Sequence, residues 1–159
     1  MTKKYITIKC EPNNSNLSVY GVFNDEESMN CSFEQLKKIK PFDGYFDIVT
    51  MGRLQCYVSD TGLIDGKPFN LGASILMARP LYGDALILAS DAKYQGHTEF
   101  LSEEMTDSCV ALLDDFYKSA WNTSSEDATS SVFGAWCKAC DVHKMEYFKR
   151  LNALAKGFK

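Results

Sequence analysis

The sequence lacks the long apolar segments and the phosphate-binding motifs by which many protein classes are recognised. No run approaches the roughly eighteen apolar residues of a membrane-spanning helix, and no apolar stretch of a secretory signal follows Met1. There is no P-loop, and no GxGxxG motif follows a strand pattern. We therefore expect a cytoplasmic protein without membrane association and, apart from the zinc considered below, without a cofactor.

Histidine is also scarce, which limits the catalytic arrangements that the chain can build. The only two histidines are His97 and His143, and a nucleophile–histidine system would need one of them. The adjacent acidic pairs at 103–104 and 114–115 lie in a helical pattern, where neighbours point about 100° apart and do not converge as an acid–base pair. The sequence thus assigns no catalytic residue.

An excess of positive charge is missing as well. The chain has 17 Lys and Arg against 21 Asp and Glu, a net charge of −4, which argues against general nucleic-acid binding. The acidic residues concentrate in 91–130 and the basic ones after Asp141, a pattern that predicts either two complementary helices or a charged partner surface. The six cysteines accompany no secretory signal, so we expect reduced thiols.

The first ninety residues predict an α+β core domain, residues 1–90. Alternating apolar and polar residues, often β-branched, predict strands at 5–10, 17–23, 45–50, 54–58 and 84–89. Capping residues introduce two short helical patterns, one at 33–39 after Ser32 and one at 71–78 after Asn70. The predicted fold is a mostly antiparallel sheet of about five strands with two short helices.

Residues 91–159 predict a helical C-terminal extension, packed on the core or on a partner subunit. A capped helix begins after Ser102 and keeps apolar residues at intervals of three and four as far as Phe116. The polar composition of 121–131 predicts a linker before a longer helix. The aromatic stripe of that longer helix is a candidate partner surface if the helix does not fold back, and a two-fold homodimer is another way to bury it. The stripe consists of Phe133, Trp136, Tyr147 and Phe148.

A ligand site is predicted around the second short helix. Free backbone amides at the helix that begins after Asn70 suit an anion, and Lys67 and Arg79 are near in sequence. This grouping predicts a small phosphate-bearing ligand.

A cysteine and histidine cluster near the C-terminus suggests other chemistry. Cys137, Cys140 and His143 have the CxxCxxH spacing of zinc ligands, but a tetrahedral site needs a fourth ligand from elsewhere. Trp136 and Cys137 also begin a WCxxC motif, although the helical context is unlike that of a redox enzyme. A zinc-supported structural module therefore stays open as an alternative.

The order of motifs in residues 4–89 resembles a small uncharacterised domain family of phage, plasmid and large-virus genomes. The matching features are Gly44-Tyr45, the turn 60–62, Asn70 with a following helix, and the segment 80–84 before a final strand. The resemblance implies an α+β fold and a viral setting, hence the host cytoplasm, and assigns no activity. We expect a non-enzymatic accessory protein that binds a host protein or a small ligand, for example to counteract host defence. The alternatives are a small phosphate-ligand-directed enzyme and the zinc-supported module.

Overall fold

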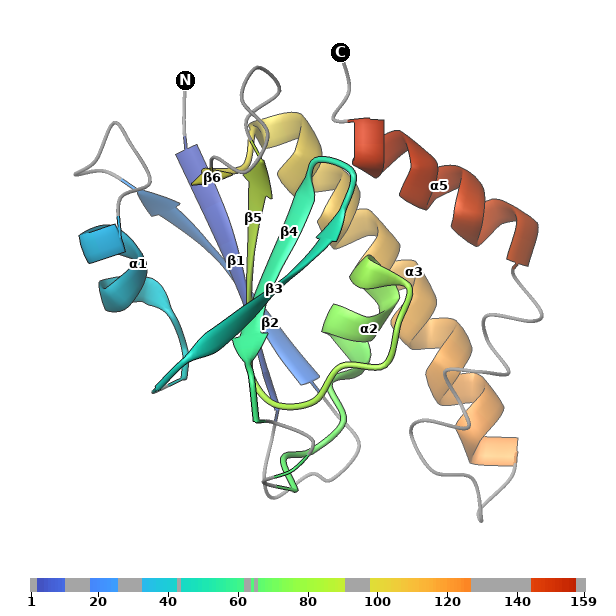
Figure 1. Ribbon diagram of the computed structural model, residues 1–159. Helices are drawn as coiled ribbons and strands as arrows, with labels where there is room; N and C mark the ends of the chain where they lie inside the picture. The colour runs from blue at the N-terminus through green and yellow to red at the C-terminus, as the bar shows by residue number, and fades with distance from the viewer. Residues whose placement is uncertain are drawn as a thin grey trace.

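An antiparallel sheet is the framework of the computed structural model (Figure 1). The structure describes residues 3–10, 18–25, 33–42, 44–61, 64, 66–90, 98–126 and 144–156. The strands are β1 (Lys3–Cys10), β2 (Ser18–Asp25), β3 (Phe46–Met51), β4 (Leu54–Ser59), β5 (Ala85–Ser90) and β6 (Thr98–Glu99). The described helices are α1 (Phe33–Ile39), α2 (Leu71–Met77), α3 (Glu103–Glu126) and α5 (Lys144–Lys156). The predicted α+β fold is confirmed.

The strand order is β2-β1-β5-β4-β3, and every neighbouring pair is antiparallel. At one end β1 and β5 separate, and β6 lies between them. There Ala89 of β5 pairs with Glu99, while Lys4 of β1 exchanges two backbone hydrogen bonds with Leu101 just after β6. Sequence reasoning missed β6 because a strand of two residues has no alternation to detect.

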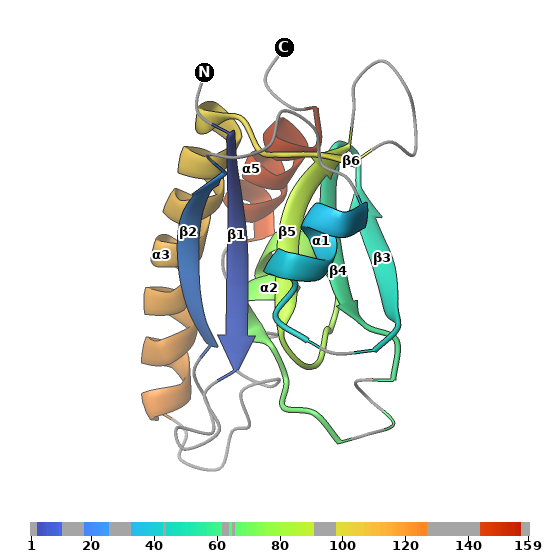
Figure 2. The same ribbon diagram turned by 90° about the vertical axis from the view of Figure 1, so that its left-hand side faces the viewer.

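The alternation of side chains along the strands divides the core between the two faces of the sheet. Helices α2, α3 and α5 cover one face, where Ile6, Cys56 and Ile87 point, and α1 covers part of the other face, where Tyr57 and Leu86 point (Figures 1 and 2). No helix in the described part of the chain is long and apolar enough to cross a membrane.

One apolar cluster joins the C-terminal helices to the sheet. It includes Met105 and Leu112 of α3, Tyr147 and Leu151 of α5, and residues of α2, β1, β4 and β5. The sheet and the extension predicted for 91–159 therefore share a core within one chain. Helix α3 also runs to Glu126, through half of the predicted linker, because Ser, Thr and Asn cost a helix only about 0.5 kcal/mol each when several turns already precede them.

The tip of the β3–β4 hairpin docks against the end of α5. Gly52 has a φ of 59°, and the backbone N–H of Arg53 donates to the carbonyl of Ala155 at 2.8 Å. The Arg53 side chain donates to the Ser90 carbonyl at 3.2 Å and forms an ion pair with Glu99 at 2.5 Å. The hairpin tip thus joins β5, β6 and α5.

Gly52→Ala should destabilise the protein more than Gly44→Ala. Both glycines have positive φ values, 59° and 87°, so each alanine carries a backbone cost of roughly 1 kcal/mol. A Cβ at Gly52 would also overlap the carbonyl oxygen of Ala155, whereas a Cβ at Gly44 meets no atom within 4 Å. We expect Gly52→Ala to cost roughly 2 kcal/mol more in urea unfolding. Equal losses in the two variants would show that α5 does not dock on this turn.

Candidate ligand pocket

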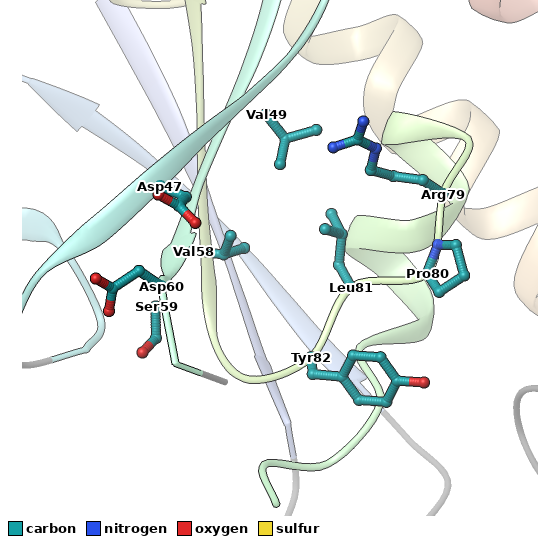
Figure 3. A pocket seen from close by; sticks show the side chains of 9 residues that line it. All are labelled: Asp47, Val49, Val58, Ser59, Asp60, Arg79, Pro80, Leu81 and Tyr82. Atoms are coloured by element: carbon teal, nitrogen blue, oxygen red, sulfur yellow. The ribbon is translucent and has the colours of Figure 1, made fainter. Parts of the chain in front are cut away.

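A pocket of about 240 Å³ lies beside β3, between the end of the β3–β4 hairpin and the connection from α2 to β5 (Figure 3). Its lining residues are Asp47, Val49, Val58, Ser59, Asp60, Arg79, Pro80, Leu81 and Tyr82. The apolar members form the floor and the charged members stand on opposite sides. In Figure 3 the guanidinium group of Arg79 reaches from the α2 side toward β3, while Asp47 and Asp60 lie on the hairpin side.

The register of the hairpin places the acidic wall. Asp47 pairs with Val58, and Val49 pairs with Cys56, so both β3 side chains point to the face that α2 and α5 cover. Asp60 follows the last residue of β4, and its backbone N–H donates to the Tyr45 carbonyl at 3.4 Å. Asp47 on β3 and Asp60 just after β4 therefore both line the pocket from the hairpin side.

The opposite wall depends on how α2 ends. Ala78 closes the helix in the left-handed conformation, with a φ of 57°, which turns the chain back along the helix. The returning segment is held by the backbone N–H of Leu81, which donates to the Ser74 hydroxyl at 3.0 Å. The carbonyl of Leu81 accepts a hydrogen bond from the backbone N–H of Asn70 at 2.8 Å. Arg79 to Tyr82 are thereby fixed facing the hairpin.

The three residues predicted to bind a ligand do not form one site. Arg79 lines the pocket, and Lys67 is exposed near Gly83, outside the lining. Asn70 is fully buried: its side-chain oxygen accepts from the Ala73 N–H at 3.0 Å, and its amide nitrogen donates to the carbonyls of Ile8 and Gly83 at 2.9 and 2.8 Å. Its side chain serves the fold, and both amide hydrogens are in use.

The pocket charges have no ion-pair partner among the described residues. In the described ranges, no residue forms an ion pair or a side-chain hydrogen bond with Asp47, Asp60 or Arg79. Two carboxylates against one guanidinium give the pocket an excess of one negative charge. Sequence reasoning missed both aspartates, although Asp47 is a charged residue in a strand pattern and Asp60 belongs to a turn signal.

The aromatic residues predicted to bind a partner have different locations. Tyr147 is 2% exposed, packs on Phe116 with ring centroids 4.6 Å apart, and donates its hydroxyl to the Ile75 carbonyl at 2.6 Å. It belongs to the core of this chain. Phe148 is 44% exposed at the surface of α5. Phe133 and Trp136 lie outside the described residues.

The predicted zinc ligands Cys137, Cys140 and His143 also lie outside the described residues. Within the described part of the chain, no group of three or more Cys, His, Asp or Glu side chains is close enough to hold a metal ion. The zinc hypothesis stays a prediction.

The described cysteines are poor nucleophiles. Burial raises the pKa of Cys56 and raises that of Cys109 to about 12. Burial, and then the negative charge of Asp84, raise the pKa of Cys10 to about 11, and its thiol lies near the carbonyls of Pro68 and Phe69. A raised pKa keeps a thiol protonated at neutral pH, so none of the three supports thiolate chemistry.

Comparisons of the chain with protein-family models, curated proteins and solved structures found no match. The resemblance to a viral and phage domain family stays a prediction. A function for the pocket therefore has to be argued from its own side chains.

Asn70→Ala should destabilise the protein by about 3 kcal/mol. The change removes a helix cap worth about 1 kcal/mol and leaves the buried carbonyls of Ile8 and Gly83 without a donor. Urea unfolding measures the loss, and a loss below about 1 kcal/mol would contradict the assigned role.

Asn70→Asp is the matched variant, because it keeps the capping oxygen and replaces the donor. A buried carboxylate facing two carbonyls has a raised pKa, so the variant should be most stable at low pH. Stability is then lost as the pH rises through the range between the ordinary pKa of aspartate and that raised pKa. We expect the gap to wild type to be smaller at pH 4 than at pH 7, and a pH-independent gap would contradict this.

Cys10 should react slowly with iodoacetamide at pH 8. A pKa of about 11 reduces its thiolate fraction by about 100-fold relative to an unperturbed thiol. In the wild type the backbone N–H of Cys10 donates to a carboxylate oxygen of Asp84 at 2.8 Å. Asp84→Asn removes the negative charge and keeps a side-chain oxygen that can accept this hydrogen bond. Peptide mapping should show faster labelling of Cys10 in this variant. Unchanged labelling would exclude an effect of the Asp84 charge.

Proposed function

We propose that the protein is a non-enzymatic binding protein whose pocket beside β3 accepts a cationic group of a partner. The observation that carries the proposal is the pair of carboxylates, Asp47 and Asp60, that line the pocket without a counterion among the described residues. Two carboxylates that line one pocket give its hairpin side a negative potential, which attracts a cationic group. Arg79, on the other wall, is a donor for a carbonyl or carboxylate of the same partner.

The pocket residues support binding more than catalysis. Ser59 is the serine among the described lining residues, and its hydroxyl could in principle act as a nucleophile. That hydroxyl accepts a hydrogen bond from the backbone N–H of Thr61 and shares another with the Thr61 hydroxyl. Among the described residues that line the pocket, none is a histidine or lysine that could act as its base. The lining thus combines an apolar floor with charged recognition groups.

A phosphate-bearing ligand has less support in this geometry. A phosphate next to Arg79 would also lie in the field of Asp47 and Asp60, and like charges oppose its binding. Lys67, the second predicted cation, is outside the lining, and Asn70 is buried. A lysine or arginine side chain suits the pocket better.

The biological setting that we propose is that of a viral or phage accessory protein. The resemblance over residues 4–89 is its support. In that setting the partner is a host protein, and a basic side chain on its surface would enter the pocket. Counteracting host defence is one role for such a complex.

The test is an NMR titration with Nα-acetyl-lysine-N-methylamide, a blocked lysine that carries one cation and two carbonyl acceptors. We expect saturable shifts at the pocket amides, with a Kd on the order of millimolar because the probe is small. Asp47→Asn and Asp60→Asn should each weaken binding several-fold, since both remove charge and preserve shape. Lys67→Ala, outside the lining, is the matched control and should bind normally.

Two further probes make the outcome decisive. Blocked norleucine has a similar length and no charge, and equal binding of it would refute the cation proposal. Inorganic phosphate should not shift the pocket amides. Shifts with phosphate that Arg79→Ala abolishes would favour the phosphate-bearing ligand instead.

A further inference from the structure

The pocket opens beside a free edge of the sheet. Among the described residues β3 is hydrogen-bonded to β4 alone, and Figure 2 shows it as the outermost strand on that side. An edge strand presents a row of backbone donors and acceptors to any strand that approaches it. The pocket and this row of polar groups are therefore accessible to the same partner.

The edge lacks two of the features with which proteins usually protect such strands, lysine and proline. Its sequence, Phe46–Met51, contains no lysine and no proline, and its single charge is Asp47. Ile48 is 47% exposed, and Tyr45, just before the strand, is 84% exposed. The other edge strand, β2, also exposes apolar side chains, but none of its residues lines this pocket.

The pleat of β3 determines what an added strand would meet. Asp47 and Val49 point to the pocket face, whereas Ile48 pairs with Tyr57 and points to the face that carries α1. Successive side chains of a strand paired with β3 would alternate in the same way. Every second side chain would reach the pocket, and the side chains between them would cover Ile48.

We propose that β3 binds an extended peptide segment of a partner by strand addition, with a lysine or arginine side chain of that segment entering the pocket that Asp47 and Asp60 line. The proposal rests on the proposed function and specifies its partner. The peptide alternates basic residues, directed into the pocket, with apolar residues directed onto Ile48. Backbone hydrogen bonds to β3 supply register, and the pocket supplies the preference for a cation.

Charge selects a basic peptide over a second copy of this chain. A second β3 at the same edge would bring no cation, because Asp47 is the only charged residue of the strand. It would bring two pockets, each with an excess of one negative charge, to one interface, where like charges are unfavourable. A basic segment compensates the charge that self-pairing would double.

The test uses the blocked peptide acetyl-Val-Lys-Val-Lys-Val-amide and versions with methylated backbone nitrogens. In an added strand, the N–H groups of alternate residues point to the neighbouring strand. One peptide is methylated at the backbone nitrogen of the central valine, and another at the backbone nitrogens of both lysines. We expect one of these two peptides to bind about tenfold more weakly and the other to bind normally, because only one of the two sets of N–H groups faces β3. Replacement of both lysines by norleucine should also weaken binding, as should Asp47→Asn, and Lys67→Ala should not.

Hydrogen exchange of the β3 amides provides an independent readout. The peptide should slow exchange at alternate residues of Phe46–Met51 and leave β2 unchanged. If the peptide binds and neither methylation matters, strand addition is overturned while the pocket proposal stands. If neither the blocked lysine nor the peptide binds, the proposed function fails and this inference with it. If light scattering shows a dimer with β3 amides already protected, a second copy occupies the edge and the proposal is overturned.

Discussion

The side chain of Asn70 is the interaction on which the arrangement of the fold depends most. One buried amide caps α2, bonds the Ile8 carbonyl of β1, and bonds the Gly83 carbonyl in the segment before β5. The same residue uses its backbone N–H to hold Leu81. Because every polar atom of the side chain is satisfied in a fully buried position, replacing it leaves several groups unpaired at once.

The pocket is a consequence of that network and of the hairpin register. Asn70 and Ser74 hold the chain that carries Arg79 to Tyr82, and the pairing of β3 with β4 places Asp47 and Asp60 on the hairpin side of the same pocket. Helix α5 closes the same face of the sheet further along, through Tyr147 in the core and Ala155 against the hairpin tip. Among the described elements, the α1 face receives only one short helix, so the sheet is covered unevenly.

Local sequence signals predicted the strands and the helix caps, because alternation and capping are properties of neighbouring residues. Asn70 was predicted as a cap, and it is one. Its bonds to Ile8 and Gly83 join residues 62 and 13 positions away, and no local pattern specifies them. The same limit explains the site: Arg79 was identified from its place near a helix, whereas Asp47 and Asp60 come to line the same pocket only through the tertiary register. Tyr147 likewise looked like one member of an aromatic stripe, and its burial depends on contacts with α2 and α3.

The position of the uncompensated charges argues for function over stability. An edge strand without lysine or proline carries a risk of unwanted pairing, and Asp47 and Asp60 form no ion pair with another described residue. A lysine at position 47 would protect the edge and offset the charge of Asp60 without any change in the core, since Asp47 is exposed. Both departures from a stability optimum occur beside one pocket at one end of one hairpin. Such coincidence of unfavourable local features is expected where a surface is adapted to receive a partner. A basic peptide strand would satisfy the backbone groups of the β3 edge and neutralise the pocket carboxylates at the same time.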